Sequence, residues 1–288
     1  MSVFLSIKVF SQMIKLSHSV FALPFALAAA ALAAKTHGIE WEQIVWIFVA
    51  MVSARSAAMG FNRLADRKLD AQNPRTRNRA LPSGLITSRA VFIILAIWCV
   101  VFVYAAYKLN HLCLYLSPLA LLIILSYSYF KRFTWTTHLV LGIALGIAPM
   151  GAWIAVTGSF NTEPLWLTAA VLTWVAGFDI IYACQDYTFD VSHGVYSIPS
   201  QWGIRLALTT ARLFHLVTVL ALLVIYYVFE LHTLYLCGTA LVAGFLVYEH
   251  RLVKANDLSK INIAFFNTNG LISVIYFVFT LGDVLWTT

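Results

Sequence analysis

Charged residues are scarce in this sequence. Asp, Glu, Lys and Arg make up 11% of the 288 residues, whereas hydrophobic residues make up 61%. Soluble domains are about 45–50% apolar, so this balance excludes an ordinary soluble domain. Cysteine is also rare, and its scattered positions show no metal-ligand spacing, which favours small apolar core residues over a zinc site. The four cysteines are Cys99, Cys113, Cys184 and Cys237.

The apolar residues gather in long runs, such as 91–107 and 206–229. A run of about 17–25 mostly apolar residues is long enough to cross a bilayer as a helix, and no cleavable signal peptide is evident. The sequence therefore predicts an all-α membrane protein, a single domain over residues 1–288, with about nine transmembrane helices in a bundle around a central cavity. The predicted spans are 18–34, 43–61, 90–107, 112–129, 138–157, 165–182, 206–229, 233–249 and 265–286.

Residues 1–17 are expected to form an amphipathic helix that lies at the membrane interface and leads into the first span. The segment carries two lysines, and its apolar side chains follow helical spacing. These apolar residues are Val3, Phe4, Ile7, Phe10 and Ile14, and the lysines are Lys8 and Lys15.

The charges are divided unevenly between the two sides of the predicted bundle. With the N-terminus inside, all 19 Lys and Arg except Lys35 and Lys108 fall in inner segments. The positive-inside rule then predicts a cytoplasmic N-terminus, and the active site is expected to face the cytoplasm. We expect the membrane to be a bacterial-type inner (cytoplasmic) membrane. This topology accounts for the pI near 9.3, so we expect the lipid bilayer, and no nucleic acid, as a partner. The outer segments carry Glu40, Glu42, Glu163, Glu230 and Asp283.

Two acidic segments lie on the predicted inner side. Asn62, Asp66 and Asp70 are spaced four apart, and they form one polar stripe if the second span continues as a helix. Asp186 and Asp190 are also four apart, and each lies 120 residues after its counterpart in the first segment. Each segment follows an even-numbered predicted span, which suggests a duplicated four-helix unit.

Carboxylates stacked in this way repel each other, so a positive charge should hold them together. Oxygen ligands without clustered Cys or His favour Mg²⁺ over zinc, and Mg²⁺ commonly bridges a few carboxylates to substrate phosphates. Nearby basic side chains can bind phosphate oxygens directly. In an apolar bundle, this combination predicts a Mg²⁺–diphosphate site for a ligand with a lipid chain. The basic residues are Arg63, Arg67, Lys68, Arg75, Arg77, Arg79, Lys131 and Arg132.

Other interpretations stay open on these residues alone. One acidic segment by itself would fit solvated surface ion pairs, but two matched segments on one face weigh against that. A cation transporter would use Asp179, Asp186 and Asp190 as its ion path, with acids near mid-membrane, whereas these lie at the inner ends of their spans. Asp179 ends an apolar span, where an acid is a functional candidate. We expect His18 and His138 to be hydrogen-bonded polar groups near helix ends rather than catalysts.

At the acidic segments the sequence resembles the UbiA superfamily of intramembrane prenyltransferases. That family is marked by NDxxDxxxD after the second helix and DxxxD after the sixth, and these appear here as NRLADRKLD (62–70) and DYTFD (186–190). The chain is most similar to the 4-hydroxybenzoate polyprenyltransferase group, and the run from FNR to NPRT also resembles a branch associated with menaquinone made by the futalosine route. Further matching stretches are HSVFALPFALAAA (18–30), NPRTRNRALPSG (73–84), SYFKRFTW (128–135) and GIALGIAPMGAW (142–153).

The resemblance implies transfer of a polyprenyl group from polyprenyl diphosphate to an aromatic acceptor, a hydroxybenzoate or hydroxynaphthoate, in ubiquinone or menaquinone biosynthesis. Two Mg²⁺ ions would be held by one acidic segment each, and metal and arginine charge would stabilise the departing diphosphate. The implied metal ligands are Asn62, Asp66, Asp70, Asp186 and Asp190. Within the same family, haem or a chlorophyll-type alcohol is an alternative acceptor.

Roles for further residues follow from the same resemblance. The allylic cation would lie against aromatic faces until a phenolic ring attacks it, and the nearby aromatic residues are Tyr127, Phe130, Phe178 and Tyr182. Asp179 would orient the acceptor or accept its proton, and together with Asp66 and Asp186 it makes up the expected catalytic set. The expected substrate-binding residues, with Arg55 for an acceptor carboxylate, are Arg55, Arg63, Arg67, Lys131, Arg132, Tyr182 and Tyr196.

Two positions depart from the family pattern. Arg63 stands where many relatives have an aspartate, and Tyr196 in GVYSIPS (194–200) stands where ubiquinone-type relatives usually have the lysine of GVKS. The diphosphate would then draw its positive charge from other basic residues, with Arg63, Arg67, Lys131 and Arg132 as candidates. Both departures concern the acceptor and the metal geometry rather than the reaction class.

Overall fold

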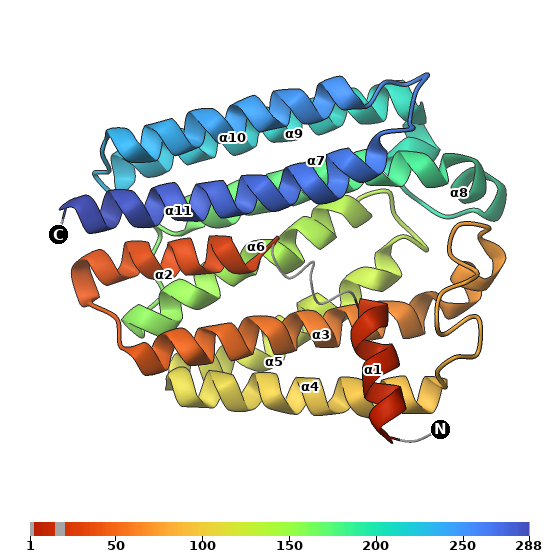
Figure 1. Ribbon diagram of the computed structural model, residues 1–288, viewed down its shortest axis with the longest axis horizontal. Helices are drawn as coiled ribbons and strands as arrows, with labels where there is room; N and C mark the ends of the chain where they lie inside the picture. Colours follow the sequence, from red (N-terminus) through yellow and green to blue (C-terminus); the bar gives the residue numbers. More distant parts are fainter. Residues whose placement is uncertain (1–2, 15–20, 288) are drawn as a thin grey trace.

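The computed structural model describes residues 3–14 and 21–287, and over those residues the chain is helical without a β-strand (Figure 1). The predicted all-α class is confirmed. In chain order the elements are α1 (Val3–Ile14), α2 (Leu23–His37), α3 (Trp41–Gln72), α4 (Ser88–Leu109), α5 (His111–Phe130), α6 (Thr137–Thr157), α7 (Leu165–Ala183), the 3-10 turn η2 (Cys184–Asp186), α8 (Tyr187–His193), α9 (Ile198–Val228), α10 (Thr233–Leu252), the π-helical turn η3 (Ile263–Thr268) and α11 (Asn269–Thr287).

Seven helices in the described residues are long and apolar enough to cross a membrane, which confirms a multi-pass membrane protein. The count of nine and the cytoplasmic N-terminus stay predictions. Helix α2 has 15 residues. The start of its predicted span, with His18, lies outside the described residues, as does Lys15 of the predicted amphipathic segment. Helix α10 has 20 residues, but its last turns carry Glu249, His250 and Arg251, which lower its hydropathy. The seven are α3, α4, α5, α6, Leu165–His193, α9 and Ile263–Trp286.

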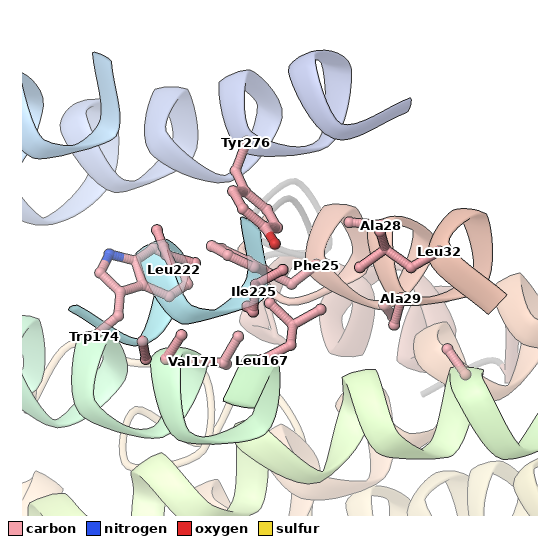
Figure 2. Close-up of a cluster of buried hydrophobic side chains, with 14 of the residues drawn as sticks. Phe25, Ala28, Ala29, Leu32, Leu167, Val171, Trp174, Leu222, Ile225 and Tyr276 are labelled. Atoms are coloured by element: carbon pink, nitrogen blue, oxygen red, sulfur yellow. The ribbon is translucent and has the colours of Figure 1, made fainter. Parts of the chain in front are cut away.

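The main core joins α2, α7, α9 and α11 (Figure 2). Phe25 of α2 lies between two aromatic rings, 4.8 Å from the Tyr276 ring centroid and 4.9 Å from that of Trp174. The indole nitrogen of Trp174 donates to the side chain of Asn269 at 2.7 Å, so the polar end of this buried ring is satisfied. Helix α7 is therefore the centre of the bundle, with 67% of its span buried, against 22% for α4 and 17% for α5.

Glycines allow α6 to approach α7 closely. A Cβ atom added to Gly142 would lie 2.5 Å from the Leu172 carbonyl oxygen, and one added to Gly146 would lie 3.0 Å from the Thr168 carbonyl oxygen. Small residues of this kind permit close backbone contact between membrane helices. This contact holds the start of α6 beside the end of α7, where His138 and Asp179 lie.

The two acidic segments have different backbones. Helix α3 begins with a capping box between Glu40 and Gln43 and runs unbroken for 32 residues, so it continues past its apolar part as the sequence predicted. Helix α7 instead ends at Ala183, and the chain passes through η2 into the short helix α8. Ser197 then caps α9 by accepting from the backbone N–H of Ser200.

Helix α1 crosses α3 and α4 near the acidic end of α3 (Figure 1). Phe10 and Ile14 are buried there in a cluster with Leu81, Ile86 and Val91. A helix therefore exists within the segment predicted to be amphipathic, and its apolar residues Phe10 and Ile14 pack on the bundle. Its place at a membrane interface, the single domain and the internal duplication stay predictions.

Candidate active site

A cavity of about 1120 Å³ lies inside the bundle, and both acidic segments line it. Its lining extends along α3 from Asp70 back to Ile47, and it includes Leu109 at the end of α4 and Cys113 at the start of α5. The charged lining residues gather toward one end, while the lining near Ile47 and Leu109 is apolar. The cavity therefore combines a polar head region with a long apolar region, as an amphiphilic ligand would require.

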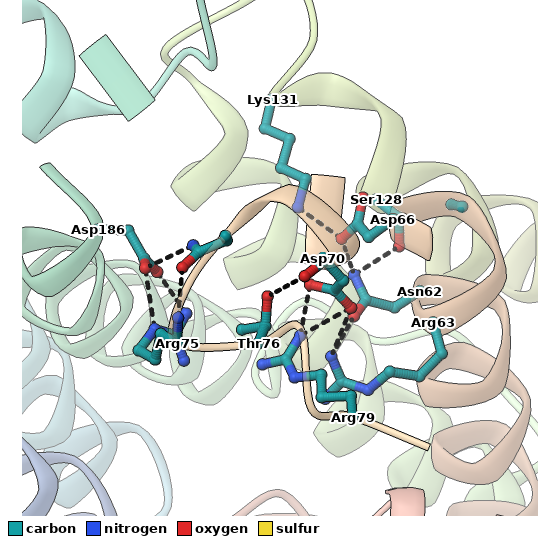
Figure 3. Close-up of polar contacts among 12 residues, drawn as sticks. Asn62, Arg63, Asp66, Asp70, Arg75, Thr76, Arg79, Ser128, Lys131 and Asp186 are labelled. Carbon is teal, nitrogen blue, oxygen red and sulfur yellow. Dashed lines mark hydrogen bonds and ion pairs between the residues drawn. The ribbon is translucent and has the colours of Figure 1, made fainter. Parts of the chain in front are cut away.

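Basic side chains surround the acids of α3 (Figure 3). Asp66 is buried, with 2% of its surface exposed, and it forms ion pairs with Lys131 and with Arg132, the latter at 3.1 Å. Asn62 donates to Asp66 at 3.0 Å. Asp70 accepts from Nη1 of Arg79 on both oxygens, at 2.8 and 3.0 Å. Both carboxylates of this segment are thus neutralised by neighbouring cations.

Two residues of the loop between α3 and α4 bind the second acidic segment. Arg75 donates to Asp186 through two nitrogens, Nε and Nη2, with the Nε bond at 2.9 Å, and Asn73 donates to the same carboxylate at 3.0 Å. Burial lowers the pKa of the Arg75 guanidinium, but the hydrogen bond and ion pair with Asp186 outweigh it and raise the pKa above its ordinary value. Arg75 also donates to the Tyr182 hydroxyl at 3.2 Å. The loop between α3 and α4 thus connects the two acidic segments, and the contacting residues Arg75 and Asp186 are 111 positions apart in the sequence.

The direct side-chain partner of Asp190, by contrast, is a neutral hydroxyl. Its Oδ2 accepts from the Ser197 hydroxyl at 3.1 Å, and no ion pair with a described residue reaches it. Asp190 is buried and lines the cavity. A buried carboxylate without a direct ion pair is costly to keep charged, and either protonation or a bound cation would relieve that cost.

Asp179 is held by His138, which confirms that this histidine is a hydrogen-bonded polar group. The Nδ1 atom of His138 lies 2.7 Å from Oδ2 of Asp179, and its Nε2 accepts the backbone N–H of Ile198 at 3.2 Å. Since Nε2 accepts, Nδ1 carries the proton in the neutral ring and donates it to Asp179. His138 is 2% exposed, whereas the Asp179 side chain is 24% exposed and lines the cavity. The carboxylate is therefore oriented toward the cavity by a buried donor.

Arg55 also faces the cavity. Its Nε is buried and has no hydrogen-bond partner among the described residues. A buried guanidinium nitrogen without a hydrogen-bond partner is costly in an apolar bundle. A carboxylate on a bound ligand would satisfy it.

Most of the predicted site residues meet in this cavity, but some do not. All five predicted metal ligands line it. The other predicted residues that line it are Arg55, Arg63, Tyr127, Lys131, Phe178, Asp179, Tyr182 and Tyr196. Arg67 instead donates to Ser88 at 3.2 Å and does not line the cavity. Arg132 contacts Asp66 from outside the lining, and Phe130 is likewise not part of it. The backbone N–H of Tyr196 donates to the Lys131 carbonyl at 2.8 Å.

The structure adds residues that the sequence-based set omitted. Asn73 was not considered, Arg75 and Arg79 were considered only as members of the basic loop, and the contact of His138 with Asp179 was not foreseen. The available signal was the Asn73–Pro74 pair, which favours a turn and here directs the loop back over the end of α3. No local pattern indicated that Arg75 would reach Asp186.

Comparisons with known proteins identify the family to which the chain belongs. The model of the UbiA prenyltransferase family matches residues 22–271. A 4-hydroxybenzoate octaprenyltransferase from Aliivibrio fischeri (strain MJ11) is 31% identical over 230 residues, which is 80% of each chain. One from Tolumonas auensis is 33% identical over 81% of each chain. The chain therefore belongs to the UbiA prenyltransferase family, and it is a membrane-embedded prenyltransferase.

Solved structures show the same fold. The apo structure of a UbiA homolog from Aeropyrum pernix K1 superposes with a TM-score of 0.84 at 31% identity, covering 94% of this chain and 98% of the homolog. A UbiA homolog from Archaeoglobus fulgidus, bound to DMAPP and Mg²⁺, has a TM-score of 0.76 at 16% identity, covering 96% and 99% of the two chains. At that identity the second likeness concerns the fold alone.

Proposed function

We propose that this protein transfers a polyprenyl group from polyprenyl diphosphate to an aromatic acid, a hydroxybenzoate or hydroxynaphthoate, in quinone biosynthesis. One observation carries the proposal: two acidic segments and a set of basic side chains converge on the head of a cavity whose remaining wall is apolar. A diphosphate fits the head, and a prenyl chain fits the apolar wall. The 4-hydroxybenzoate octaprenyltransferase relatives support a polyprenyl donor and an aromatic acid acceptor.

The donor groups of the site suit Mg²⁺. All five proposed ligands, Asn62, Asp66, Asp70, Asp186 and Asp190, offer oxygen atoms, which this ion prefers. Among the described residues, no three Asp, Glu, His or Cys side chains are grouped closely enough to hold an ion alone. This suits an ion bound through one or two carboxylates and the phosphates of its substrate. When bound, Mg²⁺ would supply positive charge to the leaving diphosphate.

The basic residues would handle the diphosphate. Arg75, Arg79 and Lys131 line the cavity and are paired with carboxylates in the free protein. A bound diphosphate offers these cations new oxygen acceptors, and guanidinium groups suit phosphate geometry. The carboxylates they release are then free to bind a divalent ion. In the free protein, the ion pairs therefore neutralise these buried charges until the donor binds.

The reaction breaks the allylic C–O bond of the donor and forms a C–C bond to the aromatic ring. Phe178, Tyr127 and Tyr182 line the cavity near Asp179, where their ring faces would stabilise the allylic cation and exclude water. Arg55 would hold the acceptor carboxylate. The ring proton displaced by the new bond would pass to Asp179, whose carboxylate is held in place by the His138 N–H.

A reconstitution assay tests the proposal. Purified protein in detergent, given Mg²⁺, octaprenyl diphosphate and 4-hydroxybenzoate or a dihydroxynaphthoate, should form the prenylated acid, and EDTA should stop the reaction. Arg55→Gln should raise the KM for the acceptor by about tenfold, the value of one lost charged hydrogen bond, and leave the KM for the donor nearly unchanged. Prenylation of haem alone, or a full rate in EDTA, would contradict the proposal.

A further inference from the structure

Helix α6 contains three glycines, and two of them have a packing reason. Glycine inside a helix costs stability relative to alanine. At Gly142 and Gly146 this cost is offset by close packing on α7, because a Cβ atom at either position would crowd the α7 backbone. Gly151 has no such contact, since nothing lies within 4 Å of a Cβ atom built on it. Its presence therefore needs another explanation.

Gly151 lines the cavity, whereas Gly142 and Gly146 do not. It shares one face of α6 with Leu141, Leu145 and Ala148, which also line the cavity and are spaced three or four residues apart. Since a helix rises 1.5 Å per residue, Gly151 lies about 20 Å along α6 from His138. His138 marks the level of Asp179. Gly151 thus borders the apolar part of the cavity, far from the acidic head.

The apolar part of the cavity continues toward the ends of the helices remote from the acids. Ile47, Cys113 and Ile154 line it, and all three lie near those ends of their helices. Along α3, Ile47 lies about 28 Å from Asp66 by helical rise, close to the thickness of a bilayer core, about 30 Å. A chain that occupied this length would pass the level of Gly151.

We propose that Gly151 determines the length of prenyl chain that the cavity accepts, because its missing side chain leaves the passage to the remote end open. This inference rests on the proposed function. A bulky side chain at position 151 would project into space that no protein atom fills. A short prenyl chain, which ends before this level, would not meet it, whereas a long chain would collide with it or have to fold back.

The test compares donors of different length on Gly151→Phe. Transfer from octaprenyl diphosphate should fall by about tenfold or more, as expected for overpacking of one ring, while transfer from dimethylallyl and geranyl diphosphate should stay within about twofold. Gly151→Ala should keep the donor profile of the unmodified protein. Gly244→Phe is the matched control, because Gly244 also has nothing within 4 Å but lies on α10 outside the cavity lining.

The outcomes separate this inference from the proposed function. If the unmodified protein transfers no prenyl group from any donor, the proposed function fails. If it does, but Gly151→Phe loses all donors equally while retaining its thermal unfolding midpoint, position 151 borders the acceptor or the head region and the length role is wrong. An unchanged donor profile in Gly151→Phe, or the same change in Gly244→Phe, would also overturn it.

Discussion

The acids of α3 and the acids that follow α7 reach the same cavity by different means. On α3 an unbroken helix aligns Asn62, Asp66 and Asp70, and cations from several elements neutralise both carboxylates. After α7 the backbone breaks at η2, so Asp186 and Asp190 lie on two short elements. Asp186 takes its cation from the loop of the first segment, and Asp190 has a hydroxyl partner. One continuous helix aligns the acids of the first half, whereas those of the second half lie on two separate elements, and both halves take cations from other parts of the chain.

The difference also concerns what a ligand must displace. A ligand at the α3 acids has to exchange with Lys131, Arg132 or Arg79, while one at Asp190 meets a carboxylate without a cation. Removing a cation from a buried carboxylate is costly unless another charge replaces it. Of the four acids in the two segments, Asp190 is the one at which a bound cation would displace no ion pair with a described residue.

The largest expected effect comes from removing one acid of each segment. Asp66→Asn and Asp186→Asn should each lower prenyl transfer by about 100-fold or more, the scale of losing one charged transition-state contact. Asp66→Asn should also lower the free energy of unfolding by about 1–3 kcal/mol, because it leaves two cations next to a buried neutral side chain. Asp186→Asn should cost less stability, since both Asp186 and Arg75 are more exposed. Product assays and thermal unfolding measure the two effects, and full activity in either variant would exclude its acid from the site.

A smaller effect should distinguish the two arginines that bind the acids. Arg75 contacts Asp186 through two nitrogens, which a lysine cannot imitate, whereas Arg79 contacts Asp70 through one. Arg75→Lys should raise the KM for the donor by about tenfold, and Arg79→Lys should raise it only by about twofold to threefold. Steady-state kinetics with saturating acceptor measure both values. Equal increases in the donor KM would mean that both arginines contribute equally to diphosphate binding. The contact between Arg75 and Asp186 would then have no separate effect on donor binding.

The smallest effect should come from the cap of α9. Ser197→Ala removes both the N-cap and the hydrogen bond to Asp190, so it should cost about 1 kcal/mol of stability and shift the dependence of activity on Mg²⁺ concentration. Thr87→Ala is the matched control, because Thr87 caps α4 by a similar bond to Ala90 and does not line the cavity. Thr87→Ala should lose less stability, because it removes a cap but no bond to a buried carboxylate, and it should leave the Mg²⁺ dependence unchanged. An identical Mg²⁺ response in both variants would leave Ser197 with a structural role only.

The sequence by itself determined the membrane class, the all-helical fold and the family. It also determined the stripe of Asn62, Asp66 and Asp70, because residues four apart on one continuous helix share a face whatever the helix packs against. The relation of this stripe to Asp186 and Asp190 was visible as a matched spacing. These are local or compositional signals, and local signals need no knowledge of how the helices are placed.

Only the tertiary structure decided which side chains meet. Three features depend on how far each helix is rotated and where its neighbours lie. These are the contacts of Asn73 and Arg75 with Asp186, the contact of His138 with Asp179, and the place of Gly151 beside the cavity. Arg67 is an example of a residue that spacing alone misplaced. It belongs to the basic segment, but it donates to Ser88 instead of lining the cavity. Spacing along a chain fixes the face of one helix, whereas the contacts between helices follow from packing of the whole bundle.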